Sequence, residues 1–166
     1  AESIGQPIFP WRGRITCSPA AGFAGSVDKT AAAADQVDHF FNGEWGFNRM
    51  VEHYAALCDH AGGVDAFIIG TEMVGTTTIR SSENTYPAVT EFKKLAATVK
   101  GIMGPDTKVG YAADWSEYHS HRPGDGSGDV YFHLDPLWAD PNIDFIGIDN
   151  YLPLSDWRDG TTHLDY

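Results

Sequence analysis

The sequence of 166 residues predicts an α/β protein built on a parallel sheet. Three observations carry this prediction. Short apolar runs alternate with longer segments of helical periodicity, the runs lack the polar alternation of a half-exposed strand, and each run ends directly at a polar or acidic residue. The helical segments are long enough for the right-handed crossovers that join neighbouring parallel strands. A chain of this length buries one sizeable core, so one domain over residues 1–166 is expected.

The first half of the chain carries four segments with a clear signal. In order, they are a strand at residues 14–18, a helix that follows the cap residue Ser26 and runs to about Phe41, a helix at 46–61, and a strand at 64–70. The first strand ends at Pro19, and Ser26 can cap the helix that follows. The second helix has an apolar stripe at spacings of three and four, and Gly62 ends it. The run after it suits a strand buried on both faces.

The second half repeats the alternation of helix and strand. Its segments are a helix at residues 87–103, a strand at 108–113, a short segment at 133–139 and a strand at 143–148. Pro87 suits the first turn of the long helix, and Gly104 with Pro105 ends it. This order extends the pattern of a parallel sheet with crossover helices.

Charge and hydropathy exclude two classes of protein. The chain has 11 Lys and Arg against 23 Asp and Glu, a net charge of -12. Because phosphate binding needs a positive field, no nucleic-acid partner is expected. No uninterrupted apolar stretch of about 18 residues occurs, so no membrane span is expected. The given sequence opens at Ala1 without an initiator Met, a basic segment or an apolar segment, so we expect a processed product or a piece of a longer protein.

Polar residues, most of them acidic or aromatic, gather where the predicted strands end. These residues are Ser18, Thr71, Glu72, Asp114, Trp115, Glu117, Tyr118, Asp149, Asn150 and Tyr151. In parallel α/β proteins this edge carries the functional site. A glycosidic bond needs a carboxylic acid as proton donor and a second carboxylate, and flat aromatic rings stack on sugars. Desolvation among aromatic rings also raises the pKa of a carboxylic acid, which suits proton donation near neutral pH.

Glu72 is the strongest single candidate. It directly follows an apolar strand, and the next predicted helix begins many residues later, too far away for Glu72 to cap it. The other strand-end acids have a structural alternative, because such acids often cap helices or bind loop amides. Asp149 and Asn150 can equally form a turn.

Metal and cofactor sites have weaker support. The residues that could form a metal site are His119, His121 and His133 with Asp114, Glu117 and Asp135. Their spacing matches no closed zinc pattern. Residues 125–129 resemble a calcium loop, but Val130 stands where that loop needs Gly and Pro136 where it needs Glu. No phosphate or dinucleotide motif occurs. We therefore expect no metal and no cofactor, with a metal-dependent hydrolase as an alternative. Cys17 and Cys58 are not expected to pair, because a thiol on an apolar helix face is a small hydrophobic group.

Five segments of the chain resemble one family. They are residues 10–19, 63–72, 110–118, 133–140 and 144–157. Together they resemble the TIM-barrel-like domain of gene transfer agent and phage-tail baseplate proteins, which belong to the tail tip of phage-like particles. That family is in turn similar to retaining glycoside hydrolases of the barrel clan that includes β-mannanases. A closed (β/α)8 barrel typically has about 250 residues. The resemblance therefore implies part of such a barrel, spanning strands three to six.

The resemblance also implies an activity and the residues that perform it. Glu72 would end the fourth strand and act as general acid/base, next to a Thr71 that stands where the clan usually has Asn. The nucleophile would be a Glu at the end of the seventh strand, after Tyr166, so this chain alone is expected to be inactive. The residues that would position the sugar are Thr71, Asp114, Trp115, Glu117, Asp149, Asn150 and Tyr151.

The partners that the resemblance implies are a bacterial surface or cell-wall glycan and other tail or baseplate proteins. The implied location is the tail of a phage-like particle, made in the bacterial cytoplasm and extracellular after release. The alternative from another functional class is a structural or glycan-binding barrel of the tail tip that performs no catalysis, because a fold alone does not establish a function.

Overall fold

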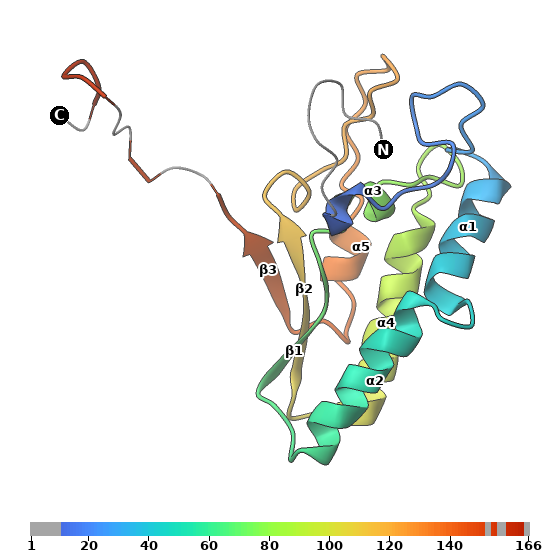
Figure 1. Ribbon diagram of the computed structural model, residues 1–166, viewed down its shortest axis with the longest axis vertical. Helices are drawn as coiled ribbons and strands as arrows, with labels where there is room; N and C mark the ends of the chain where they lie inside the picture. Colours follow the sequence, from blue (N-terminus) through green and yellow to red (C-terminus); the bar gives the residue numbers. More distant parts are fainter. Residues whose placement is uncertain (1–10, 152–153, 156–158, 165–166) are drawn as a thin grey trace.

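The structure, a computed structural model, describes residues 11–151, 154–155 and 159–164. Its helical elements are η1 (Arg12–Arg14, a 3-10 turn), α1 (Ala31–Asn42), α2 (Phe47–His60), α3 (Val74–Thr77), α4 (Pro87–Met103) and α5 (Asp135–Trp138). Its strands are β1 (Ala66–Thr71), β2 (Lys108–Asp114) and β3 (Phe145–Asp149). They form one parallel sheet in the order β1-β2-β3 (Figure 1). The predicted α/β class and parallel sheet are confirmed, and the described strands do not close into a barrel.

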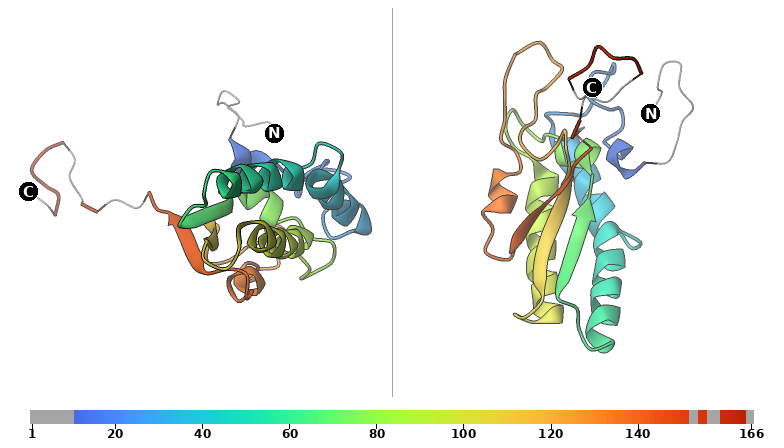
Figure 2. Two further views of the ribbon diagram at one scale, coloured as in Figure 1. Left: turned by 90° about the horizontal axis from the view of Figure 1, so that it is seen from below. Right: turned by 90° about the vertical axis from the view of Figure 1, so that its left-hand side faces the viewer.

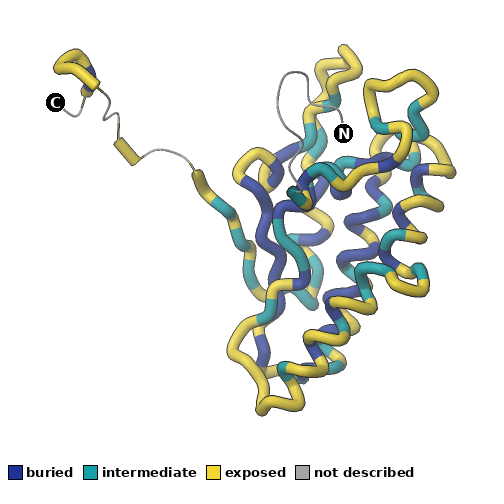
Figure 3. The backbone as a smooth tube through the Cα atoms, viewed as in Figure 1, coloured by how far each residue is buried: buried dark blue, intermediate teal, exposed yellow. Residues whose placement is uncertain are grey.

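The helices cover one face of the sheet (Figure 2). The ring of Phe92 in α4 is fully buried, with its centroid 4.9 Å from Tyr111 in β2 and 5.0 Å from Phe41 in α1. Since side chains alternate along a strand, Val109, Tyr111 and Ala113 all face this core, and all three are fully buried. Figure 3 shows the same pattern, with the buried positions concentrated along β2 and the inner side of α4.

The opposite face of the sheet is partly open. Ile68 in β1 pairs with Gly110 in β2, on the face away from α4, and is 50% exposed. The prediction that residues 64–70 are buried on both faces is therefore wrong for this structure. The physical reason is that helices pack against only one side of the three described strands (Figure 2).

Residues 14–18 do not form the predicted strand. Arg14 ends the 3-10 turn η1, Ile15 is extended, and residues 15–18 pair with no strand in the described part of the chain. Their polar backbone groups bond to side chains instead. The carbonyl of Ile15 accepts from Thr76 Oγ1 at 2.8 Å, while the amide and carbonyl of Ser18 bond to the side chain of Gln36 at 2.8 and 2.9 Å. These contacts replace the hydrogen bonds of a sheet.

The helices differ from the prediction at three points. α1 begins at Ala31 rather than near Ser26, whose hydroxyl accepts from the amide of Asp28 in the preceding loop. The short helix α3 has no apolar repeat long enough to be predicted. The apolar stripe of α2 is only half covered: Met50 and Tyr54 are 50% and 56% exposed and line an apolar groove of about 610 Å³ between α2 and β1. α4 has the predicted bounds.

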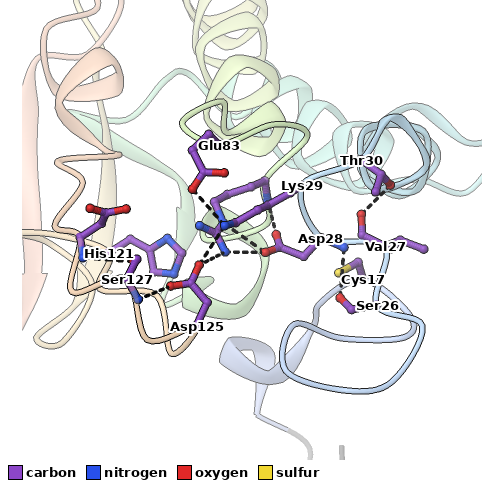
Figure 4. A network of polar contacts seen from close by, with 12 residues as sticks. Cys17, Ser26, Val27, Asp28, Lys29, Thr30, Glu83, His121, Asp125 and Ser127 are labelled. Atoms are coloured by element: carbon purple, nitrogen blue, oxygen red, sulfur yellow. Dashed lines mark hydrogen bonds and ion pairs between the residues drawn. The ribbon is translucent and has the colours of Figure 1, made fainter.

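An ion-paired group, here called the loop cluster, ties three loops together near the carboxyl ends of the strands (Figure 4). It consists of Asp28, Lys29, Arg80, Glu83 and Asp125. The guanidinium of Arg80 donates to Asp28 Oδ2 from Nη2 at 2.7 Å and from Nε at 3.1 Å, and lies 3.4 Å from Asp125. Lys29 pairs with Glu83 and Asp125 at 3.0 and 2.9 Å. Every acid of the loop cluster therefore has a cation beside it.

Candidate functional site

Three carboxylates lie where the parallel strands end, and we call them the edge acids. They belong to Glu72, Asp114 and Asp149. The register pairs Thr71 with Ala112 and Asp114 with Asp149, so the polar side chains of the three strand ends share the face away from α4. The sequence predicts this gathering from strand ends alone, and the observed register brings Thr71, Asp114 and Asp149 together.

Glu72 occupies an unusual position in the chain. Its backbone is left-handed, with φ at 51°, a conformation that residues other than Gly seldom adopt. Its carboxylate is held by neutral donors: the indole Nε1 of Trp11 donates to Oε2 at 2.8 Å, and the hydroxyl of Tyr151 donates to Oε1 at 3.3 Å. The guanidinium of Arg12 lies farther away, at 3.9 Å. Only 7% of the residue is exposed, so Glu72 is buried although it lies at the edge of the sheet.

α3 begins two residues after Glu72, much sooner than the sequence predicts. The Glu72 side chain nevertheless does not cap it. The residue at the cap position is Met73, which makes no side-chain capping hydrogen bond, and the Glu72 carboxylate bonds to Trp11 and Tyr151 instead.

Asp114 and Asp149 are adjacent on β2 and β3. Two carboxylates side by side repel each other, and each here is offset by a neutral donor. The hydroxyl of Thr71 reaches across β2 to donate to Asp149 Oδ2 at 2.7 Å, while the amide and hydroxyl of Ser116 donate to Asp114 Oδ1. Thr71 pairs with Ala112, which pairs with Gly147, and these two small residues leave room for Thr71 to reach Asp149, two positions beyond Gly147.

Glu117 lies inside the fold rather than at the open edge. It is 1% exposed, and its carboxylate accepts three hydrogen bonds, from Thr77 Oγ1 at 2.6 Å, from the Tyr111 hydroxyl at 2.9 Å and from the Asp114 amide at 3.0 Å. Burial raises the pKa of this carboxyl, against the lowering effect of the three donors. The sequence prediction groups Glu117 with the sugar-positioning residues. In the structure its carboxylate contacts the backbone of Asp114, one of these residues, and is buried.

The aromatic residues predicted for the site are solvent-accessible. Trp115 is 44% exposed and Tyr151 70% exposed, and Asn150 between the strand end and Tyr151 is exposed as well. The charge of Glu72 and its hydrogen bond raise the pKa of the Tyr151 phenol, with smaller contributions from Asp149 and Asp114. Tyr151 therefore lies within the field of all three edge acids.

Sequence reasoning missed two contributors to this site. Trp11 is 61 positions away from Glu72 and has no local signal that connects them. Tyr111 does have a signal: it is the one residue with a polar side-chain atom between the first and last residues of the strand Lys108–Asp114. A buried Tyr hydroxyl needs a hydrogen-bond partner, which predicts a polar contact somewhere beside that strand.

The histidines considered for a metal site take other positions. The ring of His121 meets Tyr86, with Nδ1 3.1 Å from the phenol oxygen, and its centroid is 5.9 Å from that of His133. His119 Nδ1 lies 2.6 Å from Ser120 Oγ. Over residues 11–151, 154–155 and 159–164, no group of three or more His, Cys, Asp and Glu side chains is arranged to hold a metal ion. Both cysteines are free thiols.

Comparisons with known proteins give one match. Residues 45–166 match the family model of the GTA TIM-barrel-like domain, where GTA stands for gene transfer agent. No curated protein and no solved structure matches the chain. Among the described helices, none has the length and apolar character needed to cross a bilayer.

Proposed function

The chain belongs to the GTA TIM-barrel-like domain family, and from this premise we propose that it is a glycoside-hydrolase-like barrel domain in the tail baseplate of a phage-like particle. Family membership associates the chain with gene transfer agents. The proposal adds an activity, in which Glu72 is the general acid/base of a retaining glycosidase that acts on a bacterial surface or cell-wall glycan. It adds other tail and baseplate proteins as partners.

The observation that carries the proposal is the position of the Glu72 carboxylate. Glu72 directly follows β1 at the carboxyl edge of a parallel sheet and is 7% exposed, and the nearest partners of its carboxylate are the neutral donors of Trp11 and Tyr151. A general acid must hold a proton at the start of the reaction and exist as a carboxylate later. Neutral hydrogen-bond donors tolerate both states better than a tightly bound cation, which would favour only the carboxylate.

The proposed reaction uses Glu72 twice. Protonated Glu72 gives its proton to the glycosidic oxygen as the bond from that oxygen to the anomeric carbon breaks, while a second carboxylate attacks the anomeric carbon and forms a glycosyl ester. The Glu72 carboxylate then takes a proton from water, whose oxygen attacks the same carbon and releases the second carboxylate. Glu72 ends the cycle protonated, and the sugar keeps its anomeric configuration.

The remaining edge residues suit the recognition of sugar hydroxyls and ring faces. Asp114 and Asp149 supply acceptors at the same edge, and Thr71 holds Asp149 in place. The exposed rings of Trp115 and Tyr151 offer flat apolar faces to the C–H surfaces of a sugar. Asn150 adds an exposed amide beside Tyr151. In this proposal these six residues bind substrate, and Glu117 holds the backbone of Asp114 from inside the fold.

The test compares gene transfer agent particles that carry wild-type protein or Glu72→Gln with isolated cell-wall and surface polysaccharide as substrates. We expect wild-type particles to release new reducing ends and Glu72→Gln particles to lose at least about a hundredfold in rate, since general acid catalysis contributes about 10²–10⁴-fold. Glu44→Gln is the matched control, because Glu44 is exposed and lies outside the site. Equal release by wild-type and Glu72→Gln particles would contradict the catalytic role.

A second candidate is a glycan-binding barrel of the tail tip without catalysis. The exposure of Trp115, Tyr118 and Tyr151 at one rim favours it, because sugar stacking needs exposed rings and no proton transfer. Polysaccharide pull-down with Trp115→Ala particles distinguishes the two functions. Binding that depends on Trp115, without release of reducing ends by wild-type particles, would support the binding function over the catalytic one.

A further inference from the structure

The hydroxyl of Tyr111 connects the backbone after Glu72 to the buried carboxylate of Glu117. It accepts a hydrogen bond from the amide of Met73 at 2.9 Å and donates one to Glu117 Oε1 at 2.9 Å. Both contacts are buried. Since Met73 directly follows Glu72, the Tyr111 hydroxyl acts on the peptide that sets the direction of the Glu72 side chain.

The backbone at Glu72 needs such support. A φ of 51° at a residue other than Gly is a strained conformation that persists only where its surroundings hold it. Two hydrogen bonds hold this one from both sides: the amide of Glu72 donates to the carbonyl of Ala112 at 2.8 Å, and the amide of Met73 donates to Tyr111. Both acceptors belong to β2, so β2 fixes the turn that presents Glu72.

Glu117 in turn fixes the Tyr111 hydroxyl. Its Oε1 accepts from Tyr111 and from Thr77 in α3, the helix that begins immediately after Met73. Its Oε2 accepts from the amide of Asp114, the second edge acid. One carboxylate therefore joins the last residue of α3 to the middle and the end of β2, and through Tyr111 it is linked to Met73 after β1.

We propose that Tyr111 and Glu117 are positioning residues that hold the Glu72 carboxylate at the open edge through the Met73 amide. The catalytic importance of this pair rests on the proposed function of Glu72, whereas the positioning itself does not. The protonation state of the Tyr111 phenol supports the arrangement. Burial, followed by the charge of Glu117, keeps the pKa of the Tyr111 phenol well above its ordinary value of 10.0, so the phenol retains the proton that it donates.

The Trp11 indole provides a direct probe of where the Glu72 carboxylate lies, because its N–H donates to that carboxylate at 2.8 Å. Its ¹H–¹⁵N resonance, assigned with Trp11→Phe, is compared in wild type, Tyr111→Phe and Tyr86→Phe. Tyr86→Phe is the matched control, since it also removes a buried hydroxyl, one that contacts His121 instead. We expect Tyr111→Phe to shift the indole proton upfield as its hydrogen bond lengthens, and Tyr86→Phe to leave it unchanged.

A folded Tyr111→Phe with an unshifted indole proton would overturn the proposal, and so would an equal shift in Tyr86→Phe. Where Tyr111→Phe does not fold, Glu117→Gln decides. Gln keeps a carbonyl oxygen for Tyr111 and Thr77 but turns its NH₂ toward the Asp114 amide, so a smaller shift in the same direction is expected. An unshifted indole proton in Glu117→Gln would again overturn the proposal.

Catalysis gives a separate readout in particles that release reducing ends. A misplacement of a catalytic group by about 1 Å costs about a hundredfold in rate. We expect Tyr111→Phe to lower kcat by about that factor with KM nearly unchanged, and Tyr86→Phe to alter neither. The absence of turnover by wild-type particles would refute the proposed function and leave the indole experiment as the test of positioning. If Tyr111→Phe and the control Tyr86→Phe both lowered KM and kcat to the same extent, the positioning role would be overturned.

Discussion

The loop cluster and the edge acids lie near the same end of the sheet, yet their carboxylates are held in opposite ways. In the loop cluster, Asp28 accepts two hydrogen bonds from the guanidinium of Arg80 and a third from its backbone amide. At the edge, Glu72 and Asp149 accept their closest hydrogen bonds from an indole and a hydroxyl. The acids of the loop cluster are bound to cations. The edge acids can exchange a neutral hydrogen-bond donor for a ligand.

The difference separates acids that hold the fold from acids that remain available for chemistry. A buried ion pair loses much of its stabilisation when one partner is removed, because the other charge is left desolvated. A carboxylate that is held by neutral donors loses a smaller interaction when one donor is removed. Under the proposed function, the charge partners distinguish Asp28 from Glu72 better than burial does, since both side chains have little exposed surface.

Removing the cation of the loop cluster is expected to have the largest effect on stability. The side chains of Arg80 and Asp28 are 4% and 8% exposed, so Arg80→Ala leaves a buried carboxylate without its cation. We expect a loss of about 3–5 kcal/mol in the free energy of unfolding, measured by urea denaturation. Arg80→Lys keeps the charge but not the two-pronged hydrogen bond, so a smaller loss is expected. If Arg80→Ala lowered the free energy of unfolding by less than about 0.5 kcal/mol, as an ordinary surface substitution does, the loop cluster would not stabilise the fold.

Removing a neutral donor at the edge is expected to cost less. Thr71→Val deletes the hydroxyl that donates to Asp149 at 2.7 Å and should lower the free energy of unfolding by about 1 kcal/mol. Thr98→Val, on the exposed side of α4, is the control and should change little, because its hydroxyl bonds only to a carbonyl of its own helix. A loss with Thr71→Val as large as that with Arg80→Ala would contradict the distinction between the two regions.

Asp125 and Glu117 should make smaller contributions to the free energy of unfolding, and these two contributions should change with pH in opposite directions. Hydrogen bonds from Ser127 and Lys29 lower the pKa of Asp125 below its ordinary value of 3.8. Its ionisation therefore stabilises the folded state above that value, and the benefit disappears as the pH falls. Burial raises the pKa of Glu117 above its ordinary value of 4.5, so its ionisation disfavours the folded state as the pH rises through the raised value.

These signs are tested by urea denaturation of Asp125→Asn and Glu117→Gln between pH 3 and pH 8. The cost of Asp125→Asn should be largest near neutral pH and shrink below pH 3.8. The cost of Glu117→Gln should be largest at low pH and shrink as the pH rises above 4.5. If the cost in free energy of unfolding changed with pH in the same direction for both variants, the opposite pKa shifts of Asp125 and Glu117 would be contradicted.

Most of the fold follows from local sequence signals, and its exceptions have nonlocal causes. The helix Pro87–Met103 is predicted with its observed bounds, because Pro87 begins it and Gly104 ends it. The segment at residues 14–18 has the composition of a strand, but contacts from Gln36 and Thr76 satisfy its backbone. No pattern within those five residues reveals partners that are 18 and 61 positions away.

The candidate site also has a part that local sequence signals predict and a part that depends on distant segments. Strand ends identify Glu72, Asp114 and Asp149 as neighbours, since parallel strands end at one edge. The order of the sheet and the left-handed backbone of Glu72 decide what surrounds them, and neither is visible in the sequence. Trp11 reaches Glu72 from a distant segment, and Glu117, three residues from Asp114, turns inward to Tyr111. Short-range pattern finds the acids, and tertiary structure determines their roles.

The central claim is that the Glu72 carboxylate serves chemistry and not stability, and one paired measurement tests it most directly. Glu72→Gln and Asp28→Asn are each compared with wild type in free energy of unfolding and in release of reducing ends by particles. We expect Glu72→Gln to lower release at least about a hundredfold while changing the free energy of unfolding by no more than about 1 kcal/mol, because a Gln oxygen still accepts from Trp11. Asp28→Asn should lose about 3 kcal/mol. A large loss of stability in Glu72→Gln with release intact would contradict the account.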